Sequence, residues 1–424
     1  MDRLQTFREV LARLDPTRPI RARDEQGWYV ERPDKVATLV ANTFHLEPAS
    51  SHLVIGSIGC GKSTELLEIS RRLMTAPDVS ARYVEVSTII DPKEATAADL
   101  LVALMLDLLQ DLEDGTYFAP FLSDQVQAEH ASLLEEVVGI QEGLRSIQAW
   151  GTRRKGPEVR PHRPDHPEEP PAGDLGEYQE LLRDVRNFVR QASTGSLVWL
   201  LDGLDRLQDP LRFDELITPV LQVVKSVGIG LVVVAPRRVV SGLDRLGTPS
   251  DFDEIHAVAP VDPTPGTAGH GFLSQVLSLR SSSRLLPDEH GEELIRLSGG
   301  VLRMLLQITK QAIKEAYVRG EDGVSSAHVE VAGEKLGRDL VFGLDSSDVR
   351  VLLALAETGR FAGRTDEDFA LVRSNRILEY MTASGQRRYA VHPCLQPLLP
   401  VLQAELEPRG ESQPAFLGDD DIPF

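Results

Sequence analysis

The sequence predicts an α/β fold in which helices cover a parallel sheet, followed by a helical lid and a C-terminal winged-helix domain. A glycine-rich loop at 56–61 joins the apolar run Leu53–Ile55 to a helical pattern, which is a strand–loop–helix order. Two further apolar runs, 197–202 and 230–235, have the length and continuity of strands buried on both faces of a parallel sheet. Helical patterns begin at 267 and are followed by two short segments with strand character, which is the order of a winged helix.

The first strand, the loop and the start of the following helix, residues 53–64, fit the phosphate-binding pattern Gly-x-x-x-x-Gly-Lys-Ser completely. Glycines let backbone N–H groups surround a β-phosphate, and the helix that follows adds the positive end of its dipole. Lys62 supplies a compact positive charge for the β- and γ-phosphates, and the hydroxyl of Ser63 is the expected Mg²⁺ ligand. The residues expected to hold a nucleotide here are Gly56, Ser57, Ile58, Gly59, Cys60, Gly61, Lys62, Ser63 and Thr64.

Composition sets the broad class of the protein. The 424 residues exceed one ordinary core, so two or three domains are expected. No apolar run is long enough to cross a membrane, and the N-terminus lacks a signal-peptide profile. Two cysteines far apart in the chain, Cys60 and Cys394, indicate a reduced, cytoplasmic protein without a disulfide framework. The net charge of −20 argues against broad, non-specific nucleic-acid binding, although it leaves room for a small basic patch.

Residues 1–24 are expected to contain an N-terminal helix, and a P-loop NTPase domain is expected from 25 to 265. The aromatic and aliphatic stretch 28–33 lies just upstream of the first strand. One interpretation places this stretch, with Val30, against an adenine ring. The other makes it a core contact for the helix predicted at 34–45, and the sequence favours neither.

After the loop helix, residues 82–87 alternate like a strand, and long helices are expected at 95–113 and 119–149. The composition then changes. Residues 151–173 are rich in proline, arginine and histidine and contain almost no aliphatic residues, which is typical of a mobile surface insertion. A further helix is expected at 174–193, before the next apolar run.

The apolar run 197–202 ends in Asp202, and a carboxylate at the end of a buried strand can hold Mg²⁺ through water. Because it follows a complete phosphate-binding loop, this run is the expected second half of a nucleotide site. Arg237 follows the run 230–235, at the end of the sheet where ligands bind in open α/β folds. Arg237 is therefore a candidate contact for the γ-phosphate, and a surface basic pair with Arg238 is the alternative.

The C-terminal part is predicted to consist of a last strand at 253–259, a lid over 266–343, a winged-helix domain over 344–404 and a disordered acidic tail over 405–424. The lid helices are expected at 272–279, 287–297, 301–317 and 327–336. The winged-helix domain is expected to contain a helix near 346–355, a short segment at 365–373 and a hairpin of 376–381 with 387–393.

With these elements in this order, the chain resembles STAND-type and origin-recognition-type ATPases of the AAA+ group over about residues 25–400, apart from the insertion. The resemblance implies that ATP and ADP are the nucleotides, that residues 56–64 form the Walker A motif and that residues 197–205 form Walker B. It also implies that Arg237 is the sensor-1 arginine. Arg303, in the lid sequence Ser-Gly-Gly-Val-Leu-Arg, is then the sensor-2 arginine.

The sequence Val-His-Pro at 391–393 is similar to the histidine–proline element of the STAND winged helix. The resemblance implies that His392 touches the phosphates of the nucleotide and holds the ADP form closed. Packing of His392 against the lid is the alternative interpretation.

Gly203 departs from the pattern of AAA+ motors, which carry a glutamate directly after the Walker B aspartate to orient the attacking water. Asp205 is the candidate to act in its place, although its side chain is shorter and lies two residues further on. The resemblance therefore implies slow hydrolysis, as in a switch rather than a motor. The chain also carries neither the effector domain nor the sensor repeats of typical STAND proteins, so its output is expected through a partner protein, DNA or self-assembly.

A signalling switch is the first functional hypothesis. ATP or ADP would set the angle between the sheet domain, the lid and the winged helix, and a partner would recognise that angle. The resemblance adds bacterial signalling or antiphage defence as the setting. A pure scaffold is disfavoured by the intact Lys62, Ser63 and Asp202, because a scaffold needs no charged phosphate site.

A DNA-binding ATPase of the origin-recognition type is the second hypothesis. Its recognition segment would be 365–373, which begins with three acids that DNA phosphates repel. The segment is also short for a helix that contacts bases in a groove. The basic residues nearby are Arg373, Arg376, Arg387 and Arg388. These charges favour the switch over DNA binding.

Overall fold

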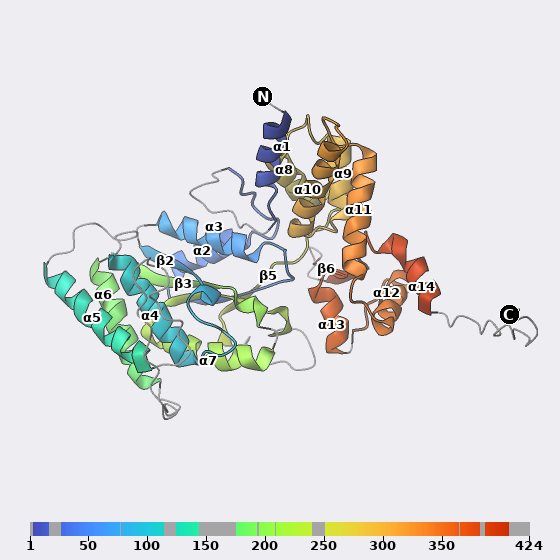
Figure 1. Ribbon diagram of the computed structural model, residues 1–424. Helices are drawn as coiled ribbons and strands as arrows, with labels where there is room; N and C mark the ends of the chain where they lie inside the picture. The colour runs from blue at the N-terminus through green and yellow to red at the C-terminus, as the bar shows by residue number, and fades with distance from the viewer. Residues whose placement is uncertain are drawn as a thin grey trace, which may run out of the picture.

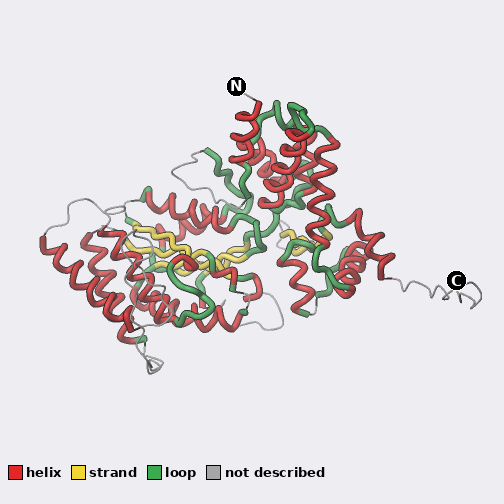
Figure 2. Tube along the Cα trace, in the orientation of Figure 1, coloured by secondary structure: helices red, strands yellow, loops and turns green. Residues whose placement is uncertain are grey.

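The protein is described by a computed structural model (Figure 1), which covers residues 3–16, 27–76, 78–113, 124–143, 175–192, 195–207, 209–239, 251–363, 365–381 and 386–406. The insertion predicted at 151–173 lies outside the described residues, and so do residues 407–424 of the predicted tail. Figure 2 shows the large sheet in one part of the molecule and a mostly helical part, formed by the later chain, beside it.

Five parallel strands form the central sheet, in the order β2-β3-β4-β1-β5. Their bounds are β1 Ser51–Ile55, β2 Val79–Glu85, β3 Ser196–Asp202, β4 Gly230–Ala235 and β5 Glu254–Ala257. The structure thus confirms the predicted parallel sheet. Because the strands all run in one direction, the residues that follow β1, β3 and β4 gather at the same edge of the sheet.

Helices cover both faces of the sheet, which explains the continuous apolar runs of its central strands. One face carries α2 and α3, and the other carries α4, α6 and α7, with α5 packed outside against α4 and α6 (Figure 1). Along β3, Trp199 joins the core on the α4 side and Leu200 joins the core on the α2 side. The helices are α2 Val36–Leu46, α3 Lys62–Met74, α4 Ala97–Glu113, α5 Asp124–Gly143, α6 Gly176–Ala192 and α7 Pro210–Val227.

The lid consists of four helices, and the N-terminal helix packs against it. The ring of Phe7 in the N-terminal helix lies 5.1 Å from that of Tyr317 between centroids, and Arg3 forms an ion pair with Asp322 at 3.1 Å. The N-terminal helix predicted within residues 1–24 therefore contributes to the core of the lid. The bounds are α1 Arg3–Arg13, α8 Ala268–Arg280, α9 Asp288–Leu297, α10 Leu302–Val318 and α11 Ser326–Val341.

The winged-helix domain follows, with a two-stranded antiparallel hairpin formed by β6 and β7. Its apolar residues join one continuous core with those of the lid, so the lid and the hairpin are packed together. The last helix, α14, was not predicted from the sequence. The bounds are α12 Ser346–Thr358, α13 Asp366–Arg373, β6 Ile377–Met381, β7 Arg387–Val391 and α14 Leu399–Leu406.

Short 3-10 turns follow several strands at the edge where the nucleotide is expected. They are η1 Val86–Thr88 after β2, η3 Leu204–Arg206 after β3 and η4 Arg237–Val239 after β4, while η6 Gln396–Leu398 precedes α14. Cys60 and Cys394 are both buried and free. Over the described residues, none of the helices combines the length and the apolar character that a bilayer crossing requires.

Candidate nucleotide-binding site

The phosphate-binding loop lies between the end of β1 and the start of α3, as the strand–loop–helix order predicts. Gly59 and Gly61 have φ angles of +86° and +104°, a left-handed region that favours glycine. The lid packs directly on this loop, because a Cβ on Gly59 would lie 2.6 Å from the Cβ of Arg303. The glycines therefore allow the left-handed turns of the loop, and Gly59 leaves space for the lid to pack against it.

The ammonium group of Lys62 lies inside the loop. It donates hydrogen bonds to the backbone oxygens of Gly56 and Ser57, both at 3.1 Å, and it lies 2.9 Å from a carboxylate oxygen of Asp205. Lys62 is only 5% exposed. A triphosphate bound in the loop would therefore compete with Asp205 for this ammonium group.

Asp202 ends β3 and is 2% exposed. One carboxylate oxygen accepts a hydrogen bond from the Tyr83 hydroxyl at 2.8 Å, and the other accepts from the backbone N–H of Gly203 at 2.8 Å. Ser63 is the second residue of α3 and is half-buried. Asp202 and Ser63 offer carboxylate and hydroxyl oxygens, the donor types that suit Mg²⁺, and they are the residues that would hold this ion.

Glu85 is an acidic residue of this site that sequence reasoning missed. β2 and β3 pair in a register that places Glu85 opposite Asp202. A Cβ on Gly203 would lie only 2.4 Å from Oε1 of Glu85, so the carboxylate occupies the space beside residue 203. The predicted strand 82–87 contains Glu85, but nothing in the sequence indicated that this strand ends at Glu85 or adjoins β3.

The stretch 28–33 lies beside the loop and under the lid. Residues of the stretch, of the loop with α3 and of the lid line a small pocket. From the stretch come Trp28, Tyr29, Val30 and Arg32, from the loop and α3 come Gly61, Thr64 and Glu65, and from the lid come Phe272, Val276, Arg280 and Leu302. Val30 is 8% exposed. Val30 joins the apolar core of the lid, and the pocket has a volume of about 10 Å³, which is room for about one water molecule.

Arg32 anchors this stretch to the loop, and sequence reasoning missed it as well. Its guanidinium donates to the backbone oxygen of Cys60 at 2.8 Å and to that of Ala259 at 2.8 Å, and it pairs with Asp34 at 2.9 Å. Burial acts to lower the pKa of Arg32, but the neighbouring carboxylate of Asp34 outweighs burial and the pKa is raised. Arg32 is therefore a buried cation that ties the loop to the start of the domain.

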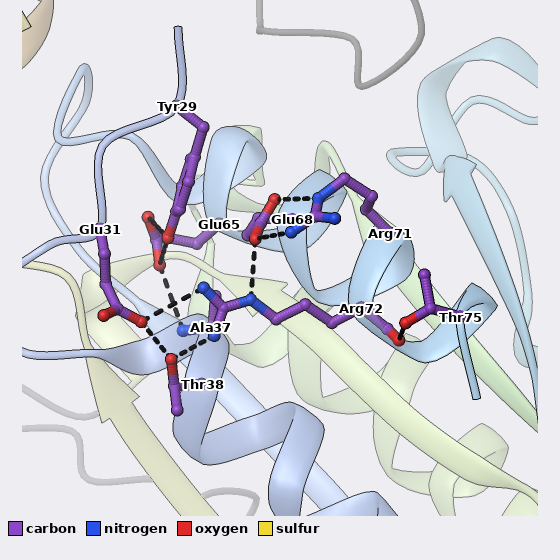
Figure 3. A network of polar contacts seen from close by, with 9 residues as sticks. All are labelled: Tyr29, Glu31, Ala37, Thr38, Glu65, Glu68, Arg71, Arg72 and Thr75. Carbon is purple, nitrogen blue, oxygen red and sulfur yellow. Dashed lines mark hydrogen bonds and ion pairs between the residues drawn. The ribbon is translucent and has the colours of Figure 1, made fainter. Parts of the chain in front are cut away.

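A polar network joins the same stretch to α3 (Figure 3). Tyr29 points its hydroxyl at Glu65, at 3.4 Å, and the backbone N–H of Ala37 donates to Glu65 at 3.2 Å. Burial raises the pKa of Glu65 to about 7, with Arg32 acting to lower it. Arg72 is the centre of the rest of the network in Figure 3. Its guanidinium pairs with Glu31 and Glu68 and donates a hydrogen bond to the hydroxyl of Thr38.

The two arginines predicted as sensors both lie at this site, in different surroundings. Arg237 forms a buried ion pair with Glu379 of β6 and donates to Oγ of Ser57 at 3.4 Å. Burial lowers the pKa of the Arg237 guanidinium. The backbone N–H of Arg303 donates to the backbone oxygen of Gly59 at 3.0 Å, while the Arg303 residue is exposed.

The winged-helix domain supplies a second contact with the loop that the sequence did not indicate. The side-chain amide of Asn375 donates to the backbone oxygen of Ile58 at 2.9 Å. Asn375 is 4% exposed and has a φ of +61°, a conformation that asparagine tolerates better than most residues. Asn375 and Glu379 thus join the winged-helix domain to the phosphate-binding loop and to Arg237.

His392 is fully buried where the hairpin meets the lid. Its Nδ1 accepts a hydrogen bond from the backbone N–H of Cys394 at 3.2 Å, and burial lowers its pKa to about 4. A Cβ on Gly299 of the lid would lie 3.4 Å from its ring. These contacts match the interpretation in which the histidine packs on the lid.

Comparisons with known proteins give a distant likeness only. No protein-family model matches the chain, and no curated protein matches it. Among solved structures, it is similar to the Aeropyrum pernix ORC2 protein in ADPNP–ADP complexes, with a TM-score of 0.46 and 14% identity over 93% of this chain and 97% of that one. It is also similar to the Aeropyrum pernix ORC1 protein in complex with DNA, with a TM-score of 0.45 and 15% identity over 93% and 98% of the chains. The Thermotoga maritima RuvB Holliday junction branch migration motor gives a TM-score of 0.41 and 14% identity over 88% and 99%.

Proposed function

We propose that this protein binds and hydrolyses ATP with Mg²⁺ and acts as a switch in which the winged-helix domain responds to the nucleotide. The observation that carries this proposal is the ion pair between Arg237, at the nucleotide site, and Glu379 of the winged-helix domain. Their side chains are 14% and 3% exposed. Because an unpaired buried charge is costly, the charge that surrounds Arg237 influences whether the winged-helix domain stays docked through Glu379.

The nucleotide site rests on the loop around Lys62 and on Asp202. Backbone N–H groups and the ammonium of Lys62 would bind the phosphates. The stretch around Val30 would contact the base only after the lid moves away from it, because the pocket there has a volume of about 10 Å³. Mg²⁺, when held by Ser63 and Asp202, neutralises phosphate charge. The loop 56–64 and Asp202 are the segments that support an ATP site.

A γ-phosphate would change the balance of charge around Arg237. It would compete with Glu379 for the guanidinium, so ATP would weaken the docking of the winged-helix domain, whereas ADP would leave the pair intact. The coupling is reciprocal, because a partner that displaces the winged-helix domain would favour ATP by the same factor. The output is then carried by a partner protein or by another copy of the chain, which we place in the cytoplasm in a signalling or defence role.

DNA binding by the winged-helix domain is the less favoured function. Arg388 pairs with Asp262 at 3.3 Å, and Arg387 pairs with Glu379 at 3.3 Å. Arg376 donates to the backbone oxygen of Leu340 at 2.7 Å. These contacts offset part of the positive charge that a DNA backbone would need, while Arg387 and Arg388 stay 52% and 49% exposed.

Hydrogen–deuterium exchange tests the switch. We expect residues 375–380 to exchange faster in the presence of a non-hydrolysable ATP analogue than in the presence of ADP. Equal exchange with both nucleotides would contradict the coupling, although it would leave nucleotide binding intact. Duplex DNA binding that weakens steeply with salt would favour the DNA-binding alternative instead.

A further inference from the structure

Hydrolysis requires a group that orients the attacking water and accepts its proton. We infer that Glu85 is this group, an inference that rests on the ATP hydrolysis proposed above. Three acids lie at the ends of β2 and β3, namely Glu85, Asp202 and Asp205. Their contacts distinguish them.

The position of Glu85 is set by the sheet. Because β2 and β3 are parallel and in register at Glu85 and Asp202, both carboxylates leave the sheet at the edge where the phosphate-binding loop lies. Oε1 of Glu85 lies 2.4 Å, and its carboxyl carbon 3.2 Å, from where a Cβ on Gly203 would be. The carboxylate therefore fills the volume that a side chain directly after Asp202 would otherwise take, and Gly203 makes room for it.

The other two acids are engaged elsewhere. Asp202 accepts hydrogen bonds on both oxygens, from Tyr83 and from the backbone of Gly203, and it is the residue expected at the metal ion. Asp205 lies 2.9 Å from the ammonium of Lys62. Asp205 is thus paired with the lysine for which a bound triphosphate competes, and the comparison of the Glu85 and Asp205 variants below separates the two acids.

The carboxylate of Glu85 is held by one oxygen and open at the other. Oε1 accepts from the Ser87 hydroxyl at 2.8 Å and lies 3.6 Å from the guanidinium of Arg206. The hydrogen bond from Ser87 and the ion-pair contact with Arg206 both use Oε1, and the side chain is 27% exposed. Oε2 is therefore the atom that can bind a water molecule and take its proton.

The proposed step is a direct displacement. The water oxygen forms a bond to the γ-phosphorus while the bond from that phosphorus to the β–γ bridging oxygen breaks. The bridging oxygen keeps the electron pair and becomes part of ADP, and Oε2 of Glu85 takes the proton that the water loses. The products are ADP and inorganic phosphate, and the proton passes from Glu85 to solvent.

The experiment compares Glu85→Gln with Asp205→Asn in the full chain. ATP binding is measured by titration with a fluorescent ATP analogue, and chemistry is measured as single-turnover release of phosphate from saturating enzyme. We expect Glu85→Gln to bind ATP within about threefold of wild type and to hydrolyse it at least about 100-fold more slowly, the usual size of a general-base effect. Glu94→Gln, an exposed acid after β2, is the matched control and should hydrolyse at the wild-type rate.

The outcomes separate this inference from the proposed function. Loss of turnover in Glu85→Gln at nearly unchanged ATP affinity, with wild-type turnover in Glu94→Gln, supports the role of Glu85. A larger loss in Asp205→Asn than in Glu85→Gln assigns the role to Asp205 and overturns this inference. Retained turnover in Glu85→Gln overturns it and leaves ATP hydrolysis standing. A wild-type protein that binds ATP without hydrolysing it overturns both the hydrolysis and this role. A purely structural role is recognised by a change in ATP affinity or melting temperature that matches the change in rate.

An independent observation at the β5 edge of the sheet carries a second proposal. His52 of β1 and Glu254 and His256 of β5 turn three ligand atoms towards one another. Nδ1 of His52 lies 3.1 Å from Nε2 of His256. Oε2 of Glu254 lies 3.3 Å from Nε2 of His256 and 3.7 Å from Nδ1 of His52. Tetrahedral Zn²⁺ with bonds of about 2.0–2.1 Å separates its ligands by roughly 3.3–3.4 Å. We propose that these side chains bind a divalent transition metal such as Zn²⁺.

The surroundings suit a metal ligand set. Nε2 of His52 lies 2.9 Å from Oγ of Ser50. When Nε2 carries the proton and donates it to Oγ of Ser50, Nδ1 keeps a lone pair that faces Glu254 and His256. Glu254 is 46% exposed and leaves a path from solvent.

Titration of the nucleotide-free full chain with Co²⁺ tests this site, because tetrahedral Co²⁺ has a strong visible absorption that Zn²⁺ abolishes by displacement. We expect stoichiometric binding by wild type, at least about tenfold weaker binding by Glu254→Gln and none by His256→Ala. His45→Ala, at an exposed histidine of α2, is the control. Absent binding in wild type, or equal binding by His256→Ala, overturns the proposal. His52 is left intact because its ring packs 4.8 Å from that of Phe44.

Discussion

The side-chain amide of Asn375 donates a hydrogen bond of 2.9 Å to the backbone oxygen of Ile58, and so joins the winged-helix domain to the phosphate-binding loop. A loop that closes around phosphates must place its backbone N–H groups within hydrogen-bond distance of them. Motion of the winged-helix domain therefore alters the loop directly. Together with the ion pair of Arg237 and Glu379, this contact holds the winged-helix domain against the proposed nucleotide site.

Replacement of Lys62 by alanine removes the cation of the loop. We expect Lys62→Ala to weaken nucleotide binding at least about 100-fold, because charge-assisted bonds to phosphate are among the strongest polar contacts. Fluorescence titration with labelled ADP and ATP measures this. Wild-type affinity in Lys62→Ala would remove the nucleotide site proposed here.

Replacement of Glu379 by glutamine removes the ion pair that joins the winged-helix domain to Arg237. Arg237 would lose its carboxylate partner at a buried position, and breaking a buried ion pair costs about 3–5 kcal/mol, so undocking of the domain becomes more favourable. We expect Glu379→Gln to release bound ADP at least about tenfold faster than wild type, as measured by stopped-flow chase of a fluorescent ADP.

The control for this experiment is Glu367→Gln, which removes an exposed acid of the same domain. It should leave ADP release unchanged. An unchanged rate in Glu379→Gln would show that the ion pair does not hold the nucleotide site closed.

Glu65 makes folding stability depend on pH. Its carboxyl group titrates near 4.5 when unfolded, and burial raises its pKa in the folded protein to about 7. Because the folded state binds this proton more tightly, the contribution is fully present below pH 4.5 and is lost as the pH rises through 7. The loss amounts to about 3 kcal/mol at pH 8.

Glu65→Gln removes this titration and keeps an acceptor for Tyr29. We expect the melting temperature of wild type to fall more steeply between pH 5 and pH 8 than that of Glu65→Gln. Glu47→Gln, at an exposed glutamate that follows α2, should behave like wild type. Parallel pH profiles for wild type and Glu65→Gln would exclude this carboxyl as the cause.

Gly203→Ala tests the space that Glu85 occupies. Gly203 has a φ of +86°, and its added Cβ would lie 2.4 Å from Glu85, so both backbone strain and displacement of the carboxylate are expected. Strain alone costs about 1–2 kcal/mol. We expect ATP turnover to fall at least about tenfold.

Gly228→Ala is the matched control, because Gly228 ends α7 with a φ of +76° and its Cβ would meet its nearest neighbour at 3.5 Å, an ordinary contact. Both variants should lose similar stability in urea unfolding. Equal loss of turnover in the two variants would assign the effect to stability rather than to Glu85.

Contiguous patterns in the sequence determined the fold class and one half of the candidate site. The loop 56–61 carries its own geometry, because glycines and the first turn of α3 fix where its N–H groups point. Asp202 ends one apolar run and Arg237 follows another. Strands that are covered on both faces are nearly continuous apolar runs, so the sequence showed where these two strands end. Helix α14 escaped prediction because Leu399 and Pro400 follow a proline-containing turn without a strong helical period.

Only the tertiary structure decided which distant side chains complete the site. The pairing of β2 with β3 brings Glu85 beside Gly203, and Asn375 reaches Ile58 from 317 positions away. Strand order and domain docking depend on the summed packing of many apolar residues, and no local pattern records them. The sequence by itself therefore determined a glycine-rich loop of the phosphate-binding pattern on a parallel sheet, while the packing of the sheet and the winged-helix domain decided which acids and amides surround it.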